Sequence, residues 1–83
     1  MTASEALATA REYKKNHITL SDFNQYVQVI YQEGTVQFFH NATARQVDDE
    51  WTAIFPEHHP SFMVHSDDAR VYLYAERLPV PKM

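Results

Sequence analysis

Cysteine is absent from the 83 residues of this chain. Disulfides, cysteine-ligated zinc, iron–sulfur clusters and thiol nucleophiles are therefore excluded. A secreted domain of this size usually needs disulfides or a metal to fold, so we expect a cytoplasmic protein. The first residues lack the basic and then apolar pattern of a signal peptide, and no run approaches the roughly 18 apolar residues of a membrane span.

Glycine is almost as scarce, since Gly34 is the only one. A phosphate-binding loop needs several glycines where the backbone approaches the ligand, so the sequence predicts no such loop. Basic residues are also few, 7 against 11 acidic residues, and the formal net charge is −4. Because DNA affinity comes from clustered lysine and arginine, nucleic acid is an unfavourable partner, and no segment predicts membrane binding.

Apolar residues are plentiful, at 45% of the chain, and 13% of the residues are aromatic. This composition supports a packed core, and the length allows a single domain over residues 1–83. Within it, the proline-containing segment 78–83 cannot complete a strand ladder and is predicted to be an extended tail.

Residues 2–16 carry the signals of a helix. Thr2 and Glu5 have capping-box spacing at its start, and Lys14 and Lys15 lie where the carbonyl groups of the last turn favour cations. The sequence therefore predicts an N-terminal helix.

Residues 19–33 fit two structures. As a helix, the segment begins with a second capping box at Thr19 and Asp22 and ends at Gly34. As a β-hairpin, it supplies one strand, 26–32, which pairs with 35–40 around the turn Glu33-Gly34 and places Val36 and Phe38 on the face of the odd-numbered apolar residues. We favour the helix by a small margin and expect a short strand over 35–40 in either case.

A third helix is predicted from Asn41 or Thr43 to Phe55, because an apolar stripe recurs at helical spacing: Val47, Trp51, Ile54 and Phe55. Pro56 ends this helix. The C-terminal segments 61–65 and 70–76 then predict an antiparallel β-hairpin around a polar loop, with Val64 opposite Val71 and Phe62 opposite Leu73. The expected fold is α+β: two N-terminal helices, the second in competition with a β-hairpin, a short strand, a third helix and a terminal hairpin packed on the helices as a small sheet.

Catalytic and metal-binding patterns are weak. His58 and His59 are neighbours on a loop and supply one metal ligand more easily than two, so we expect no metal and no cofactor. Consecutive carboxylates on a helix fan out by about 100° each and do not converge on one substrate. No serine has the flanking glycines of a nucleophile elbow, and we expect no enzymatic activity.

The terminal hairpin has two apolar faces, and the core of a domain of this size is large enough to bury only one of them. The second face carries Met63, Tyr72 and Tyr74, which combine apolar area with polar groups as protein interfaces do. Acidic side chains, which would speed association with a basic partner, complete the predicted site: Asp48, Asp49, Asp67 and Asp68.

We therefore expect a non-enzymatic regulatory or inhibitory module that occupies the surface of a protein partner, or of a second copy in a homodimer. Small acidic domains of this kind include inhibitors encoded by mobile elements, and that association extends to this chain as an expectation. The alternative is a nucleic-acid-binding transcriptional regulator of winged-helix type, suggested by the order of the predicted elements alone. Its reader helix and wing would both carry acidic residues, which phosphates repel.

Overall fold

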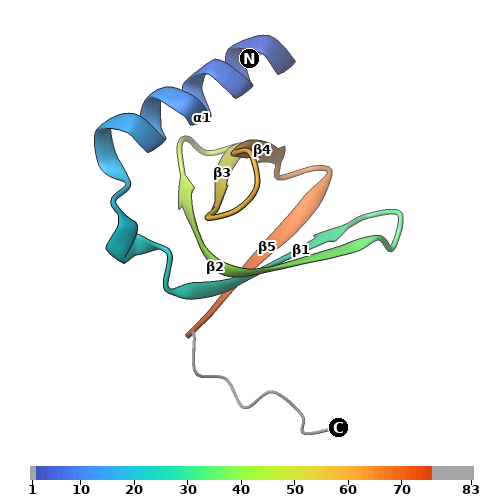
Figure 1. The fold of residues 1–83 in the computed structure, drawn as a ribbon. Helices are drawn as coiled ribbons and strands as arrows, with labels where there is room; N and C mark the ends of the chain where they lie inside the picture. The colour runs from blue at the N-terminus through green and yellow to red at the C-terminus, as the bar shows by residue number, and fades with distance from the viewer. Residues whose placement is uncertain (1, 76–83) are drawn as a thin grey trace, which may run out of the picture.

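The computed structural model describes residues 2–75, except for the side chains of Ala3 and Ala75. The predicted tail at 78–83 and the last residue of the predicted hairpin lie outside this range. One α-helix is followed by a single 3-10 turn, η1 (Leu20–Asp22), and by a five-stranded antiparallel sheet (Figure 1). The strands are β1 (Gln25–Tyr31), β2 (Val36–Gln46), β3 (Trp51–Pro56), β4 (Phe62–His65) and β5 (Ala69–Ala75).

The N-terminal helix, α1 (Ala3–His17), confirms the first predicted element. Thr2 caps it, because its hydroxyl oxygen accepts a hydrogen bond from the backbone N–H of Glu5 at 3.2 Å. Ala6 and Ala10 form its buried side, and small side chains there let the helix lie close to the sheet. α1 packs on β3 and β4.

The sheet has the order β4-β3-β2-β1-β5 and is strongly curved. Its curvature centres on the long strand β2, whose first half pairs with β1 and whose second half pairs with β3. The register against β1 shifts between Val27, which pairs with Phe39, and Gln25, which pairs with Ala42. Asn41 lies in this bulge with φ at 52°, a left-handed conformation that asparagine tolerates better than most residues.

Two apolar clusters result from this curvature. The inner cluster lies within the curve of the sheet and joins residues from strands that are not neighbours: Val27, Val29, Ala42, Ala44, Ile54, Val64 and Ala69. The outer cluster lies between α1 and β3 and contains Ala10, Ala53 and Phe55, with Tyr13 and Met63 packed against it. Both sides of β3 are therefore buried.

The predicted helix at 19–33 is wrong, and the alternative β-hairpin is the observed structure. Its capping box does form between Thr19 and Asp22, but it caps only the three residues of η1. The β-branched residues that follow belong to β1, where they pack well on a pleated surface. The observed register differs by one residue from the register that a two-residue turn would give, since Ile30 pairs with Val36. That shift moves Val36 and Phe38 to the opposite face of the sheet.

The predicted third helix is also wrong, because residues 43–55 form the end of β2, a loop and β3. Ala53, Ile54 and Phe55 are all fully buried, with Ile54 in the inner cluster and its two neighbours in the outer cluster. A strand buried on both faces shows a continuous apolar run instead of alternation. Here that run, added to Val47 and Trp51, imitates the stripe of an amphipathic helix.

The predicted pairing of the two C-terminal strands in a hairpin is wrong, although both strands exist. β4 pairs with β3 and β5 pairs with β1, so the two strands lie at opposite edges of the sheet. Val64 lies opposite Thr52 instead of Val71, and Leu73 lies opposite Val27 instead of Phe62. Since the second and third helices are not formed, the element order that suggested a winged helix is absent.

Candidate interaction surface

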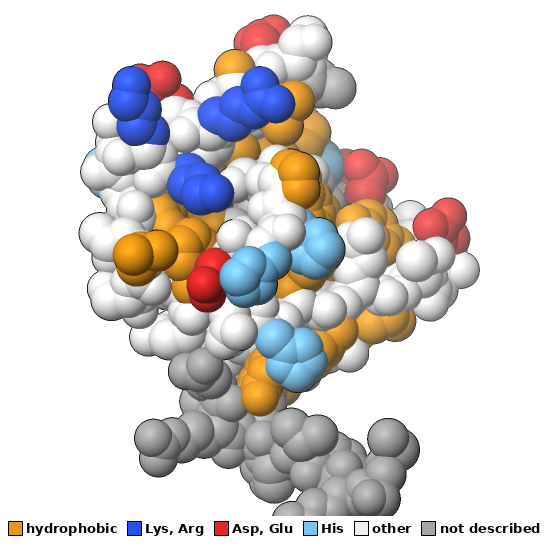
Figure 2. Space-filling view, in the orientation of Figure 1, with side chains coloured by type: hydrophobic (Ala, Val, Ile, Leu, Met, Phe, Trp, Pro, Cys, Tyr) orange, Lys and Arg blue, Asp and Glu red, His pale blue; other side chains and the backbone are white. Residues whose placement is uncertain are grey.

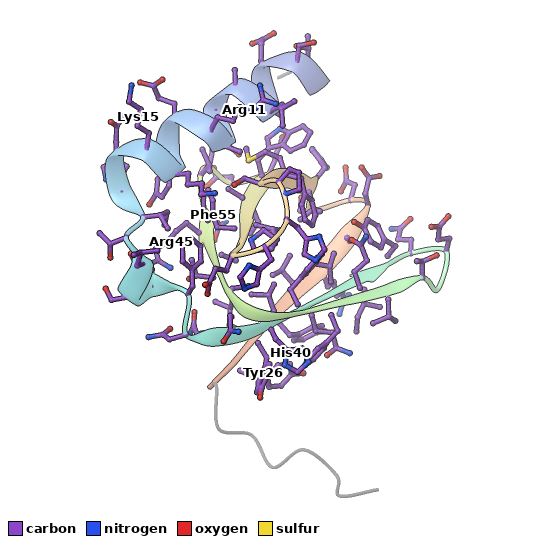
Figure 3. All side chains as sticks on the ribbon, in the orientation of Figure 1. Arg11, Lys15, Tyr26, His40, Arg45 and Phe55 are labelled. Carbon is purple, nitrogen blue, oxygen red and sulfur yellow. The ribbon has the colours of Figure 1, made fainter. Side chains whose placement is uncertain are left out.

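The outer side of β2, β1 and β5 is a continuous surface, which we call the aromatic face. Three side chains from each strand form it: Val36, Phe38 and His40 from β2, Tyr26, Gln28 and Ile30 from β1, and Arg70, Tyr72 and Tyr74 from β5. α1 covers the outer side of the other half of the sheet. Figure 3 shows Tyr26 and His40 at the end of the molecule opposite α1, pointing away from it.

Large apolar side chains are exposed on this face. Val36 is 51% exposed, Phe38 48% and Tyr72 40%, although the fold already buries two apolar clusters. In Figure 2, hydrophobic side chains and a histidine line the lower edge of the described surface, where Figure 3 places Tyr26 and His40. Contiguous apolar exposure of this kind marks interaction surfaces more often than scattered single residues do.

The aromatic rings of this face hold one another in place. Tyr26 stacks on Phe38 with ring centroids 5.5 Å apart, and His40 lies edge-on to both rings at 4.6 and 5.4 Å. On the other side of β1, the hydroxyl of Tyr74 donates a hydrogen bond to Oε1 of Gln28 at 3.1 Å. Side chains that are already ordered lose little conformational entropy when a partner binds.

The charge of the aromatic face differs from that of the whole chain. Among residues 2–75 it carries Arg70 and the imidazole of His40 but no carboxylate, whereas the chain has a formal net charge of −4. The carboxylates of residues 2–75 therefore lie elsewhere. Depletion of aspartate, glutamate and lysine together with enrichment of aromatic residues and arginine is typical of the cores of protein interfaces.

The structure separates the predicted site residues into three places. Tyr72 and Tyr74 lie together on the aromatic face. Met63 does not join them, because β4 lies at the far edge of the sheet and its side chain packs under α1 against the outer cluster. The prediction placed Met63 beside the two tyrosines because it wrongly paired β4 with β5.

The four predicted acidic residues gather at one end of the sheet. Asp48 and Asp49 lie in the β2–β3 loop, and Asp67 and Asp68 lie in the β4–β5 turn. A backbone hydrogen bond of 2.8 Å from Ser66 to Glu50 joins the two segments.

Several of these acidic groups have local structural tasks. Oδ1 of Asp48 accepts hydrogen bonds from the backbone N–H groups of Glu50 at 2.9 Å and Trp51 at 2.8 Å, which shapes the loop. His65 contacts Glu50 through Nε2 at 3.1 Å and accepts from the backbone N–H of Asp67 through Nδ1 at 3.0 Å. The carboxylates do not face one enclosed pocket as an acid–base pair would require.

A basic groove lies at the C-terminal end of α1. Arg11, Lys14 and Lys15 line it together with apolar residues, and Lys14 Nζ lies 5.9 Å from the ring centroid of Phe23. Lysines in the last turn of a helix interact favourably with its free carbonyl groups. This placement accounts for Lys14 and Lys15 without a bound anion.

The remaining histidines do not form a metal site. His59 packs edge-on to Phe39 at 5.8 Å, and Nε2 of His58 lies 3.6 Å from a carboxylate oxygen of Glu57. Within residues 2–75, no group of three or more histidine, aspartate or glutamate side chains could hold a metal ion. In the same range, no helix has the length and apolar character needed to cross a membrane.

The sequence-based site prediction contains none of Tyr26, Phe38 and His40. The signal that could have found them is the hairpin register, because a turn longer by one residue places Val36, Phe38 and the even-numbered residues of β1 on one face. The sequence alone leaves the turn length open. No family model, curated protein or solved structure matches this chain.

Proposed function

We propose that this chain is a non-enzymatic, regulatory or inhibitory module that covers a surface of a partner protein with its aromatic face. The observation that carries the proposal is the exposure of Phe38, Val36 and Tyr72 on a face to which residues 2–75 contribute no carboxylate. The two apolar clusters are built without these side chains, so the fold gives no reason for their apolar character.

The geometry of the face supports a protein as the partner. The face is broad and preordered, and it offers aromatic area together with hydroxyl, amide and guanidinium groups. Tyrosine and arginine are the residue types that contribute most to binding energy in the centres of protein interfaces. Arg70 would be paired with a carboxylate or a carbonyl group of the partner.

Single-stranded nucleic acid is the competing occupant, because bases stack on exposed aromatic rings. Such sites also need a positively charged groove that follows the phosphates. The aromatic face has one permanent cation, Arg70, and Asp68 lies two residues before it in the β4–β5 turn. Its electrostatics therefore favour protein over nucleic acid.

The test compares two purified variants with the unmodified chain. Tyr26→Ala/Phe38→Ala removes the centre of the face, and Leu20→Ala is the matched control because Leu20 is 84% exposed on η1. Each chain is immobilised and exposed to a lysate of the source cells. The protein that is retained is then purified and titrated calorimetrically.

We expect the double variant to bind at least about 30-fold more weakly, corresponding to the loss of one hot spot of about 2 kcal/mol. The Leu20 control should bind like the unmodified chain. Equal affinity of the double variant for the purified partner would refute the proposed surface. Binding of a single-stranded oligonucleotide that the double variant loses would replace the protein partner with nucleic acid.

A further inference from the structure

β5 is an edge strand. One of its edges pairs with β1, and within residues 2–75 no strand pairs with the other, which we call the open edge. It pairs with β1 through seven consecutive residue pairs, from Gln25–Ala75 to Tyr31–Ala69, and it is the last strand in the sheet order. An unpaired strand of this length presents a row of backbone donors and acceptors that another strand can use.

One hydrogen bond shows which groups face the open side. The backbone N–H of Gln32 donates to the carbonyl oxygen of Asp68 at 3.0 Å, which makes them a hydrogen-bonded pair at the end of the ladder. Pairs of this type alternate along antiparallel strands. Arg70, Tyr72 and Tyr74 therefore bond to β1, whereas Ala69, Val71, Leu73 and Ala75 present their backbone groups to the open side.

This edge has few of the features that block strand addition, and Arg70 is its one charged residue. Between Ala69 and Ala75 there is no proline, no lysine and no register shift against β1. Leu73 is 46% exposed and Tyr72 is 40% exposed, so both faces of the strand show apolar area at the edge. Natural edge strands normally carry a charge, a proline or a bulge at such positions.

We infer that the open edge of β5 binds β5 of a second copy of this chain in antiparallel orientation, with the twofold axis at Tyr72. The strand sequence is chemically self-complementary in this register. Val71 lies opposite Leu73 in a hydrogen-bonded pair, and Ala69 lies opposite Ala75. On the other face, Arg70 lies opposite Tyr74, where a guanidinium group can stack on an aromatic ring.

Within β5, the register also places no like charges opposite each other. The one charged residue of the strand, Arg70, meets Tyr74 and not its own symmetry mate. All seven residues of β5 find partners, because the axis lies at the middle of the strand. The aromatic faces of both copies would then form one surface over six strands, continuous across the axis. This inference does not depend on the proposed function.

The first test introduces single cysteines and measures disulfide cross-linking, which is possible because the chain has no cysteine of its own. In Tyr72→Cys, the new thiols face each other across the axis in a non-hydrogen-bonded pair with Cα atoms about 4.5 Å apart, within the range of a disulfide. In the control Tyr74→Cys, four residue steps separate the thiols along the strands, about 13 Å. Mild oxidation at micromolar protein should link Tyr72→Cys into covalent dimers at least tenfold faster than Tyr74→Cys.

The second test measures the mass of the chain without cysteine by sedimentation equilibrium. We expect a dimer for the unmodified chain, dimerisation at least tenfold weaker for Leu73→Lys, and an unchanged dimer for the control Leu20→Lys. Circular dichroism establishes that each variant is folded. A monomer at 100 micromolar, roughly the range in which weak interfaces associate, would overturn the inference, as would equal cross-linking of the two cysteine variants.

A dimer formed through the aromatic face itself would give a different pattern. Phe38→Ala would then dissociate it, and Leu73→Lys would leave it intact, which would also overturn pairing through the edge. These measurements use the chain alone. Loss of partner binding therefore has no influence on them, and the proposed function fails or stands separately.

Discussion

The rings of Tyr26 and His40 meet edge to face across the bulge of β2, with centroids 4.6 Å apart and planes at 88°. Alternation along β2 places His40 on the outer side beside Tyr26, and the register shift at Asn41 then returns Ala42 to the inner side. The same irregularity turns β2 from β1 toward β3. The bulge therefore lies where the aromatic face ends on β2 and where the strand begins to pair with β3.

Substitutions of Asn41 should test whether the bulge requires the left-handed backbone conformation of this residue. Asn41→Gly keeps the left-handed conformation accessible, so we expect a change in unfolding free energy of less than about 0.5 kcal/mol. Asn41→Val places a β-branched residue at a φ of 52° and should destabilise by about 1–2 kcal/mol. Urea denaturation measures both values. Equal stabilities would show that the bulge does not require this conformation.

Two phenylalanines should respond in opposite ways to truncation. Phe55 is fully buried and stacks on Tyr13 with ring centroids 5.8 Å apart, so Phe55→Ala should cost about 3–5 kcal/mol. Phe38 is 48% exposed, and Phe38→Ala should cost less than about 1 kcal/mol. Urea denaturation followed by tryptophan fluorescence compares them. A large loss for Phe38→Ala would make the aromatic face a structural necessity instead of a binding surface.

The contact of α1 with the sheet depends on small side chains. Ala10 is fully buried against Ala53 and Phe55, and Ala10→Leu should destabilise by about 1–3 kcal/mol because the larger side chain separates the helix from β3. Ala8→Leu is the control on the same helix, since Ala8 is exposed and both residues favour helices. Its unfolding free energy should change by less than about 0.5 kcal/mol. Similar losses in the two variants would contradict the observed orientation of α1.

Asp22 should make stability depend on pH. The hydrogen bond from the backbone N–H of Thr19 at 2.8 Å is the main factor that lowers the pKa of Asp22 below 3.8, and the Thr19 hydroxyl and Arg45 act in the same direction. A lowered folded-state pKa means that the stabilisation is complete above the unfolded value and disappears as the pH falls through the folded value. Asp22→Asn keeps the shape and an acceptor but removes the charge.

The difference in urea midpoint between the unmodified chain and Asp22→Asn should therefore be constant from pH 6 to 8, above the titration of carboxylates at about 4. It should vanish in acid below the folded-state pKa. Other carboxylates titrate in both proteins and cancel in the comparison. A difference that is the same at pH 3 and pH 7, roughly below and above that titration, would exclude the charge of Asp22 as its source.

The elements that the sequence predicts correctly are those with local causes. Thr2 and Glu5 lie within one turn of each other, so the start of α1 can be inferred without knowledge of the rest of the chain. Alternation along β5 likewise places Tyr72 and Tyr74 on one face, whichever strand pairs with it.

The pairing of strands that are far apart in the sequence could not be predicted from local patterns. Val64 belongs to the inner cluster and Val71 packs against that cluster, but their strands lie at opposite edges of the sheet and are not neighbours in a hairpin. Nothing local to 61–76 distinguishes these arrangements. The burial of β3 on both sides, which turned its pattern into an apparent helix, depends on the position of α1, and α1 is more than thirty residues away in the sequence.

Photo-cross-linking at position 38 tests the central claim most directly. A photoreactive phenylalanine analogue replaces Phe38 at the centre of the exposed part of the aromatic face, and the same analogue replaces Leu20 on η1 as the control. Irradiation in the source cells should link position 38, but not position 20, to one predominant partner protein of defined mass. The same partner linked equally from both positions, or no heterologous product from position 38, would contradict a protein-binding role for this face.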